Sequence, residues 1–342
     1  MLPRKLAFTL CLGLAVLFVS HAALAQYQLT NLVSNQVGWA RHDDPLAVNA
    51  WGLAYGPGGP FWISDQGSGW STLYDGKGNK KSLTVLIPTA SGGYPGQPTG
   101  IVFSNPASGN FNVGGWPAIF LFATLDGTIS GWTFKSNPNA AILAVNNSAA
   151  GSIFTGLAIA ASGNFLYAAD NWNNLVDVYD GGFNLVNSFT DPTVPAGFSV
   201  FGIQDINGLL YVAFAATNSG PGGVVDVFQE DGTFVKTLVS GNPLNQPWGL
   251  AAAPKNFGPL SNTLLVTNNI NIDGSINGFN ISTGQFVGTL KDTSGTQIHI
   301  DQLWGIEFGG GTANDGAANQ LFFTAGPKNN LAGTFGVIEF AK

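Results

Sequence analysis

Hydrophobic residues along this chain fall in short runs that are rich in β-branched and aromatic side chains, and Gly, Asn, Asp or Pro separates one run from the next. No stretch keeps the 3.6-residue apolar period of an amphipathic helix. Short runs bounded by turn-forming residues are typical of β-strands joined by tight turns. The pattern therefore predicts an all-β chain.

A unit with one plan recurs six times along the sequence. Each copy opens with Gly-Leu or Gly-Ile, preceded by Thr or an aromatic residue. The six openings are Trp51-Gly52-Leu53, Thr99-Gly100-Ile101, Thr155-Gly156-Leu157, Phe201-Gly202-Ile203, Trp248-Gly249-Leu250 and Trp304-Gly305-Ile306. Successive glycines are 48, 56, 46, 47 and 56 residues apart. Because periods of about 40–50 residues with four strands each mark propeller blades, the repeats predict six blades around one axis.

The third unit shows the strands of a blade most clearly, and we name them a to d from the axis outwards. They are expected at residues 156–159, 165–170, 175–179 and 185–189. Glycine at the head of strand a suits a crowded axis, where six inner strands converge and a side chain would collide.

The sixth unit runs out of chain before its strand d. Residues 321–324 and 336–340 supply its strands b and c. Residues 30–34 have the pattern of a strand d, so we predict that an N-terminal strand at 28–34 pairs with the strand ending at Phe340 and closes the ring. The sequence thus predicts an all-β, six-bladed β-propeller whose N-terminal strand completes the C-terminal blade.

The first 25 residues have the features of a cleaved signal peptide. Arg4 and Lys5 precede an apolar run over residues 6–19, and Ala23-Leu24-Ala25 supplies a small-x-small cleavage signature. The apolar run is shorter than the ~20 residues that a membrane-spanning helix needs. We therefore predict cleavage after Ala25, a secreted or periplasmic location, and one propeller domain over residues 26–342.

Cleavage would change the composition in ways that limit the partners. Cys11 and Met1 are the only Cys and Met of the chain, and both precede the cleavage site, so no thiol chemistry remains. The remaining chain has 10 Lys and Arg against 19 Asp and Glu, a net charge of −9. An acidic surface argues against nucleic acid and anionic membranes as partners. We expect a monomer.

Short motifs within the units resemble NHL-type repeats. They are the Gly-Ile or Gly-Leu opening, the strand-b endings Ser64-Asp65 and Ala169-Asp170, and the strand-c endings Tyr74-Asp75 and Tyr179-Asp180. The whole chain is also similar to a family of exported bacterial six-bladed propellers without assigned function. Propellers of this kind include lactonases, lyases and interaction scaffolds, so the resemblance implies the fold and leaves the activity open.

The residues before the strand-a glycines bear on metal binding. In gluconolactonase-like propellers, an Asn at this position helps to hold an axial divalent metal. Here the six positions hold Trp, Thr or Phe, none of which is a good ligand for a hard cation. We therefore predict no metal and no cofactor. Trp51, Trp248 and Trp304 are candidate ligand-binding residues that could stack on flat ligands at the axial mouth, and the alternative is that they fill the wedges between blades.

Four residues are candidate catalytic groups. Asp65 and Asp170 end strand b, where they could act as acid or base near the axis or simply cap a turn. His42 and His299 each have an acidic neighbour, and ring closure would allow them to share a site, although they could also be unconnected loop residues.

Two functions stay open on this sequence. The first is a scaffold that binds a small molecule, a carbohydrate or a protein on the face carrying the d–a and b–c loops. The second is a lactonase- or lyase-like hydrolase with an active site at the central axis. The scaffold is favoured because no Gly-x-Ser-x-Gly, His-Glu-x-x-His or phosphate-loop motif is present.

Overall fold

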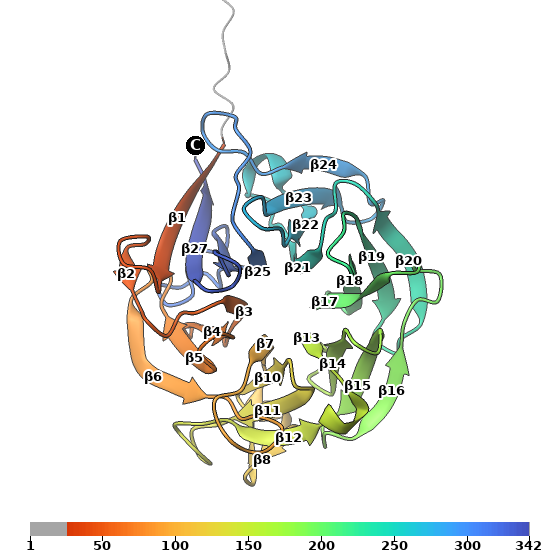
Figure 1. Ribbon diagram of the computed structural model, residues 1–342. Helices are drawn as coiled ribbons and strands as arrows, with labels where there is room; N and C mark the ends of the chain where they lie inside the picture. Colours follow the sequence, from red (N-terminus) through yellow and green to blue (C-terminus); the bar gives the residue numbers. More distant parts are fainter. Residues whose placement is uncertain (1–25, 342) are drawn as a thin grey trace, which may run out of the picture.

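Six blades, each with four antiparallel strands and the sixth with one short parallel strand added, surround a central axis in the computed structural model, which describes residues 26–341 (Figure 1). This confirms the predicted six-bladed β-propeller. The predicted signal peptide, residues 1–25, lies outside the described residues. Within residues 26–341, no helix is long and apolar enough to cross a membrane.

The first three blades follow one another along the chain. Blade 1 consists of β3 (Ala50–Tyr55), β4 (Phe61–Asp65), β5 (Trp70–Tyr74) and β6 (Lys80–Leu86). Blade 2 consists of β7 (Pro98–Phe103), β10 (Phe120–Thr124), β11 (Thr128–Trp132) and β12 (Ile142–Asn146), with the small hairpin β8 (Asn112–Val113) and β9 (Trp116–Pro117) inserted. Blade 3 consists of β13 (Phe154–Ile159), β14 (Phe165–Asp170), β15 (Leu175–Asp180) and β16 (Leu185–Phe189).

The last three blades continue the same order. Blade 4 consists of β17 (Phe198–Ile206), β18 (Leu209–Ala216), β19 (Gly223–Gln229) and β20 (Phe234–Ser240). Blade 5 consists of β21 (Pro247–Ala252), β22 (Thr263–Asn268), β23 (Ser275–Asn280) and β24 (Phe286–Thr289). Blade 6 contains β25 (Leu303–Phe308), β26 (Leu321–Ala325) and β27 (Thr334–Phe340). In the part of the chain that the structure describes, the loops contain three short 3-10 helices: η1 (Pro106–Ser108), η2 (Ser148–Ala150) and η3 (Gly258–Leu260).

The N-terminal strand closes the ring as predicted. β1 (Tyr27–Ser34) pairs antiparallel with β27, from Tyr27 opposite Phe340 to Ser34 opposite Thr334. Figure 1 shows β1 in red beside β27 in blue. A short parallel strand, β2 (His42–Asp43), adds to the outer edge of β1 and gives blade 6 five strands.

The strand-a glycines are needed because each inner strand lies against the next. A Cβ on Gly249 would lie 2.6 Å from the carbonyl oxygen of Trp304 in the following blade, closer than real Cβ atoms come. At the seam where the ring closes, a Cβ on Gly305 would lie 3.0 Å from the carbonyl oxygen of Trp51. The repeated glycine therefore permits backbone-to-backbone packing around the axis.

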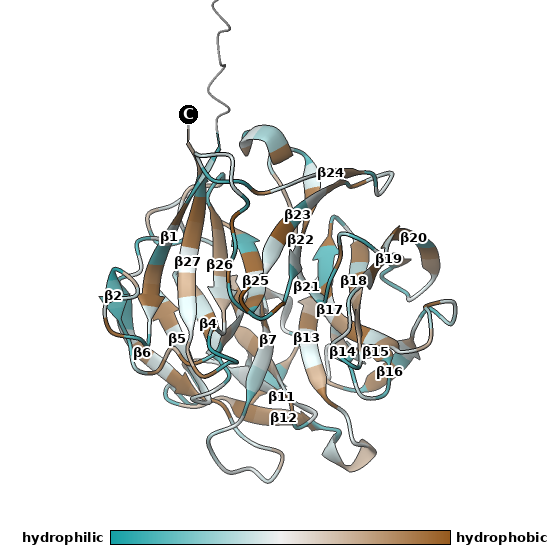
Figure 2. Ribbon diagram, turned by 45° about the horizontal axis from the view of Figure 1, so that its top comes forward, coloured by the Kyte–Doolittle hydropathy of each residue, from teal (hydrophilic) through white to brown (hydrophobic). Residues whose placement is uncertain are grey.

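The core is divided among the blades. Six clusters of buried hydrophobic residues each combine two neighbouring blades, including the pair formed by blades 6 and 1. Figure 2 shows hydrophobic residues along the strands and hydrophilic residues in many connecting loops. Since burial of apolar area is the main stabilising term, stability depends on every inter-blade layer being present.

One position in the middle of strand c is polar in five of the six blades. It is occupied by Thr72, Ser130, Asp177, Asp226 and Asn277. Asp226 is fully buried, and neither of its carboxylate oxygens has a hydrogen-bond partner within residues 26–341. Burial raises the pKa of Asp226 to about 7, with the neighbouring Thr237 side chain opposing the shift and the nearby Asp191 carboxylate adding to it.

This raised pKa predicts a pH dependence of stability. The folded state holds the Asp226 proton more tightly than the unfolded chain, so wild-type stability should fall as pH rises from about 4 to about 7. Asp226→Asn should therefore melt at a higher temperature than wild type at pH 8 and lose less stability between pH 5 and 8. Asn277 holds the same place in blade 5, where its Oδ1 accepts a hydrogen bond from Thr289 at 2.7 Å, so Asn is compatible with this position.

Calorimetry at several pH values checks the prediction. Asp180→Asn, at a partly exposed turn where hydrogen bonds from Asn184 lower the carboxylate pKa, is the control and should keep the wild-type slope above pH 5. An Asp226→Asn protein with the same pH slope as wild type would show that Asp226 does not titrate in this range.

Candidate functional site

Three positions of strand a form the centre of the molecule: the residue before the glycine and the first and second residues after it. The residue after each glycine is Leu or Ile in every blade, and all six line a narrow axial space: Leu53, Ile101, Leu157, Ile203, Leu250 and Ile306. We call this ring the apolar collar. It separates the end of the axis nearest the d–a loops from the end nearest the a–b loops.

Aromatic side chains fill the d–a end of the axis. The rings of Trp51 and Trp304 stack with centroids 3.6 Å apart, and Trp248 meets them edge-on at 6.2 and 6.1 Å. Phe201 packs against Trp304 at 5.8 Å. We call these four residues the aromatic plug.

The three tryptophans differ in their surroundings. Trp51 and Trp304 are only 5% and 4% exposed, whereas Trp248 is half-buried. Nε1 of Trp304 donates to Oδ1 of Asn49 at 2.9 Å, and Nε1 of Trp248 donates to the carbonyl of Thr155 at 2.9 Å. Nε1 of Trp51 is buried without a partner among the described residues. The tryptophans thus pack on one another across the axis, an arrangement different from both the open mouth and the inter-blade wedges considered from the sequence.

A cavity opens on the other side of the collar, at the a–b end. Its volume is about 320 Å³, and Tyr55, Phe103 and Ile159 contribute to its wall. The second residue after each strand-a glycine lies at this level: Ala54, Val102, Ala158, Gln204, Ala251 and Glu307. Gln204 and Glu307 also line the adjoining space between blades 4, 5 and 6 and the collar itself. We call the whole space the axial cavity.

Two carboxyl groups give the axial cavity its electrostatic character. Burial raises the pKa of Glu307 to about 7, and the described residues provide no hydrogen bond to its side chain. Burial also raises the pKa of Asp205 to about 6. A hydrogen bond from the backbone N–H of Gly208 lowers this pKa, and the nearby Glu230 raises it further. Perturbed carboxyls in a cavity are typical of binding and catalytic sites.

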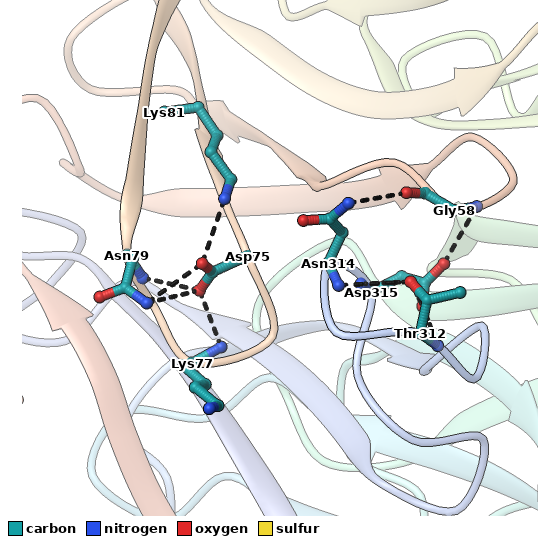
Figure 3. Close-up of polar contacts among 8 residues, drawn as sticks. All are labelled: Gly58, Asp75, Lys77, Asn79, Lys81, Thr312, Asn314 and Asp315. Atoms are coloured by element: carbon teal, nitrogen blue, oxygen red, sulfur yellow. Dashed lines mark hydrogen bonds and ion pairs between the residues drawn. The ribbon is translucent and has the colours of Figure 1, made fainter.

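A loop of blade 6 is fixed against blade 1 next to Tyr55 and Pro57 of the cavity wall, and Figure 3 shows its contacts with Gly58. Asp315 accepts hydrogen bonds from the backbone N–H of Gly58 at 3.2 Å and of Thr312 at 2.7 Å, and Nδ2 of Asn314 donates to the carbonyl of Gly58 at 3.0 Å. Gly310 of the same loop packs against the ring of Tyr55. These contacts hold the wall around Tyr55 and Glu307 in place.

Asp65 lies inside blade 1, away from the axial cavity. It is fully buried, its Oδ2 accepts from Oγ1 of Thr72 at 2.6 Å, and burial raises its pKa well above the usual value. Nearby, Asp44 accepts from the Tyr74 hydroxyl at 2.6 Å and from Nζ of Lys80 at 2.7 Å.

Asp170 makes the contacts of a turn-capping residue. Its Oδ1 accepts from the backbone N–H groups of Ile153 at 3.2 Å and Asn173 at 3.3 Å, and its Oδ2 accepts from Nδ2 of Asn173 at 2.8 Å. These bonds tie the segment before strand a of blade 3 to its b–c loop.

The two histidines lie in different parts of blade 6. His42 is exposed in β2 at the outer edge, and His299 precedes β25 with Nδ1 2.5 Å from Oδ1 of Asp273. His299 lines a side cavity of about 190 Å³ together with Trp39 and Asp301, and His42 is not among the residues lining it. Within residues 26–341, no hydrogen bond or ion pair joins any two of Asp65, Asp170, His42 and His299.

The sequence interpretation missed Gln204 and Glu307, although it contained a signal for them. When the six units are aligned on the strand-a glycine, the second residue after it is Ala or Val in four units, and only units four and six place a long polar side chain there. In the part of the chain that the structure describes, no three His, Cys, Asp or Glu side chains are grouped so as to hold a metal ion.

The fold and this centre define a six-bladed propeller whose axis is filled by aromatic residues at one end and hollow at the other. No family model matches the sequence. The uncharacterized protein R648 of Acanthamoeba polyphaga mimivirus is 31% identical over 342 aligned residues, covering 94% of this chain and 82% of that protein. The uncharacterized protein L690 of the same virus is 30% identical over 312 residues, covering 84% and 80%. The chain belongs to the family of these mimivirus proteins.

Solved structures share the fold at much lower sequence identity. A gluconolactonase from Xanthomonas campestris superposes with a TM-score of 0.58 at 13% identity, covering 93% of this chain and 91% of that one. A streptogramin B lyase superposes with a TM-score of 0.55 at 14% identity, covering 93% and 99%. These likenesses establish the propeller architecture alone.

Proposed function

We propose that this protein is a binding scaffold that holds a small molecule in the axial cavity at the a–b end of the propeller. The observation that carries the proposal is the construction of the cavity: an apolar collar forms its floor, and the polar side chains of Gln204, Asp205 and Glu307 line it above the collar. Ligand sites are typically concave and mostly apolar, with a few polar groups that orient the ligand.

The position of the aromatic plug indicates which end of the axis holds the binding site. At the d–a end, Trp51 and Trp304 occupy the centre and are almost completely buried. At the a–b end, a ligand can enter without displacing a packed ring. The proposed site is therefore at the opposite end from the loops that the sequence favoured.

A hydrolase remains the second candidate, and one observation motivates it. Glu307 has a pKa near neutrality because it is desolvated, which suits a general acid or base. The gluconolactonase and lyase likenesses agree with it at the level of fold. Binding is preferred because the described residues that line the cavity include no Ser, Thr, Cys, Lys or His to act together with Glu307.

Blocking the cavity tests the proposal. Ala54→Trp places a large ring in the cavity wall, and Ala150→Trp, at an exposed site in η2, is the matched control. A fragment library is screened by saturation-transfer NMR against both variants and the wild type. We expect a subset of fragments to bind wild type and Ala150→Trp and to lose at least about tenfold in affinity for Ala54→Trp, because the ring occupies their volume.

The result that contradicts the proposal is equally specific. If every fragment that binds wild type binds a folded Ala54→Trp protein with unchanged affinity, the axial cavity is not the binding site. Circular dichroism and thermal melting establish that both variants are folded before the comparison.

A further inference from the structure

The axial cavity carries charge of one sign only. Of the side chains that line its connected spaces, Asp205 and Glu307 are the ones that ionise near neutral pH, and no Lys, Arg or His is among them. A carboxylate-bearing or phosphate-bearing ligand would meet like charge in a partly desolvated space, which is unfavourable. The lining therefore selects against anions.

Glu307 is half-buried at the cavity and has no hydrogen-bond partner among the described residues. Burial alone accounts for its raised pKa. A desolvated carboxylate gains most from a charged donor that forms a short ion-paired hydrogen bond. Gln204, in the same ring of positions, adds a neutral amide that can accept a further N–H.

The rest of the cavity suits an apolar body. The floor is the collar of Leu and Ile, and aromatic rings of Tyr55, Phe103 and Phe308 stand in the walls. The pKa of Tyr55 is raised by burial and by the nearby carboxylates of Glu307 and Asp315, so its ring remains neutral. Neutral aromatic faces attract cations, and aliphatic walls favour methylene or aromatic groups.

From these three features we infer that the axial cavity binds a small organic amine, with its ammonium group on Glu307 and Gln204 and its apolar body against the collar. This inference rests on the proposed function and names the ligand class for the same site. The groups that face Glu307 are Tyr55 of β3, Asp205 of β17 and the apolar residues of β21, and none of them supplies a positive charge.

The test uses a matched series of probes. Primary amines from butylamine to phenethylamine are compared with the isosteric alcohols and the corresponding carboxylic acids by calorimetry at pH 8. We expect the amines to bind at least about tenfold more tightly than the alcohols, since one charge-assisted contact supplies about 1.5–3 kcal/mol, and the acids not to bind. Below about pH 7 the amine affinity should fall by about tenfold per pH unit as Glu307 protonates.

Glu307→Gln provides the decisive variant, because Gln204 shows that Gln is accepted at the same position of another blade. We expect it to remove the preference for amines and the pH dependence. Asp231→Asn, at a fully exposed acidic turn, is the control that should keep both.

Two results would overturn the inference. If amines and alcohols bind equally and both are lost in Ala54→Trp, the cavity is a binding site but its ligand is not an amine. If no amine binds while other fragments bind the wild type and not Ala54→Trp, the amine assignment is again rejected and the proposed function stands. If no probe or fragment binds the wild type more tightly than it binds Ala54→Trp, both the amine assignment and the proposed function are rejected.

Discussion

Deletion of residues 26–35 is expected to abolish cooperative folding or to lower the melting temperature by roughly 10–20 °C, the largest effect that we predict for this protein. β1 is the fourth strand of blade 6 and pairs with β27 along its whole length. Without it, β27 would become an exposed edge and the layer between blades 6 and 1 would lose Leu32 and Val33, both completely buried. Tyr27 adds a link to blade 5, where its hydroxyl donates to the carbonyl of Phe257 at 2.7 Å.

Two controls separate ring closure from the loss of single contacts. Tyr27→Phe removes only the two hydrogen bonds of the hydroxyl, to the carbonyl of Phe257 and from the backbone N–H of Leu260 at 3.1 Å, and should lower stability by about 1–3 kcal/mol. A circular permutant that joins residue 341 to residue 26 and opens the exposed turn at Asn218 should fold, because the backbone N–H of Ala341 already bonds to the carbonyl of Gln26 at 2.8 Å. Thermal melting followed by circular dichroism measures all three. A deletion protein that melts like the full chain would show that β1 is dispensable for closure.

The features that could be predicted from sequence are those that every blade must repeat. The strand-a glycine is required wherever two inner strands touch, so it appears six times and reveals the blade number. The pairing of β1 with β27 could be predicted because the sixth unit has no strand d of its own, and the N-terminal segment has the sequence pattern of a strand d. Both predictions rest on backbone geometry, which is common to all blades.

The candidate site could not be predicted in the same way because it depends on differences between blades. Glu307 and Gln204 become a site only when six unequal side chains at one level of the axis face a common space. The sequence pointed to Asp65 and Asp170, whose position at the end of strand b is repeated. In the structure these two make contacts within their own blades and turns.

Local additions to the blades also escaped the sequence pattern. The hairpin of β8 and β9 and the parallel strand β2 are two residues each, too short to show a period of alternating residues. The packing of the three tryptophans on one another was not predicted either, because it joins blades 1, 5 and 6 across the axis. Contacts between positions so far apart in sequence leave no local signal.

The aromatic plug gives the second large prediction. Trp51→Ala and Trp304→Ala should each destabilise the protein by about 3–5 kcal/mol, since each removes a stacked, almost fully buried ring and leaves a cavity at the axis. Trp248→Ala should cost less, because Trp248 is half-buried and meets the stacked pair only at its edges. Chemical denaturation measures the three values.

Replacement by Phe distinguishes ring packing from hydrogen bonding within the same stacked pair. Trp304→Phe leaves Oδ1 of the buried Asn49 without its 2.9 Å donor and should cost about 1–3 kcal/mol beyond the lost area. Trp51→Phe removes an indole N–H that is buried without a partner among the described residues, so this additional cost should be absent. The free energy of unfolding of Trp51→Phe is therefore expected to exceed that of Trp304→Phe by at least about 1 kcal/mol. Acrylamide quenching of tryptophan fluorescence in the same single variants reports how accessible each ring is to solvent. Strong quenching assigned to Trp51 and Trp304 would contradict a buried aromatic plug. It would show instead that the d–a end of the axis is an open surface.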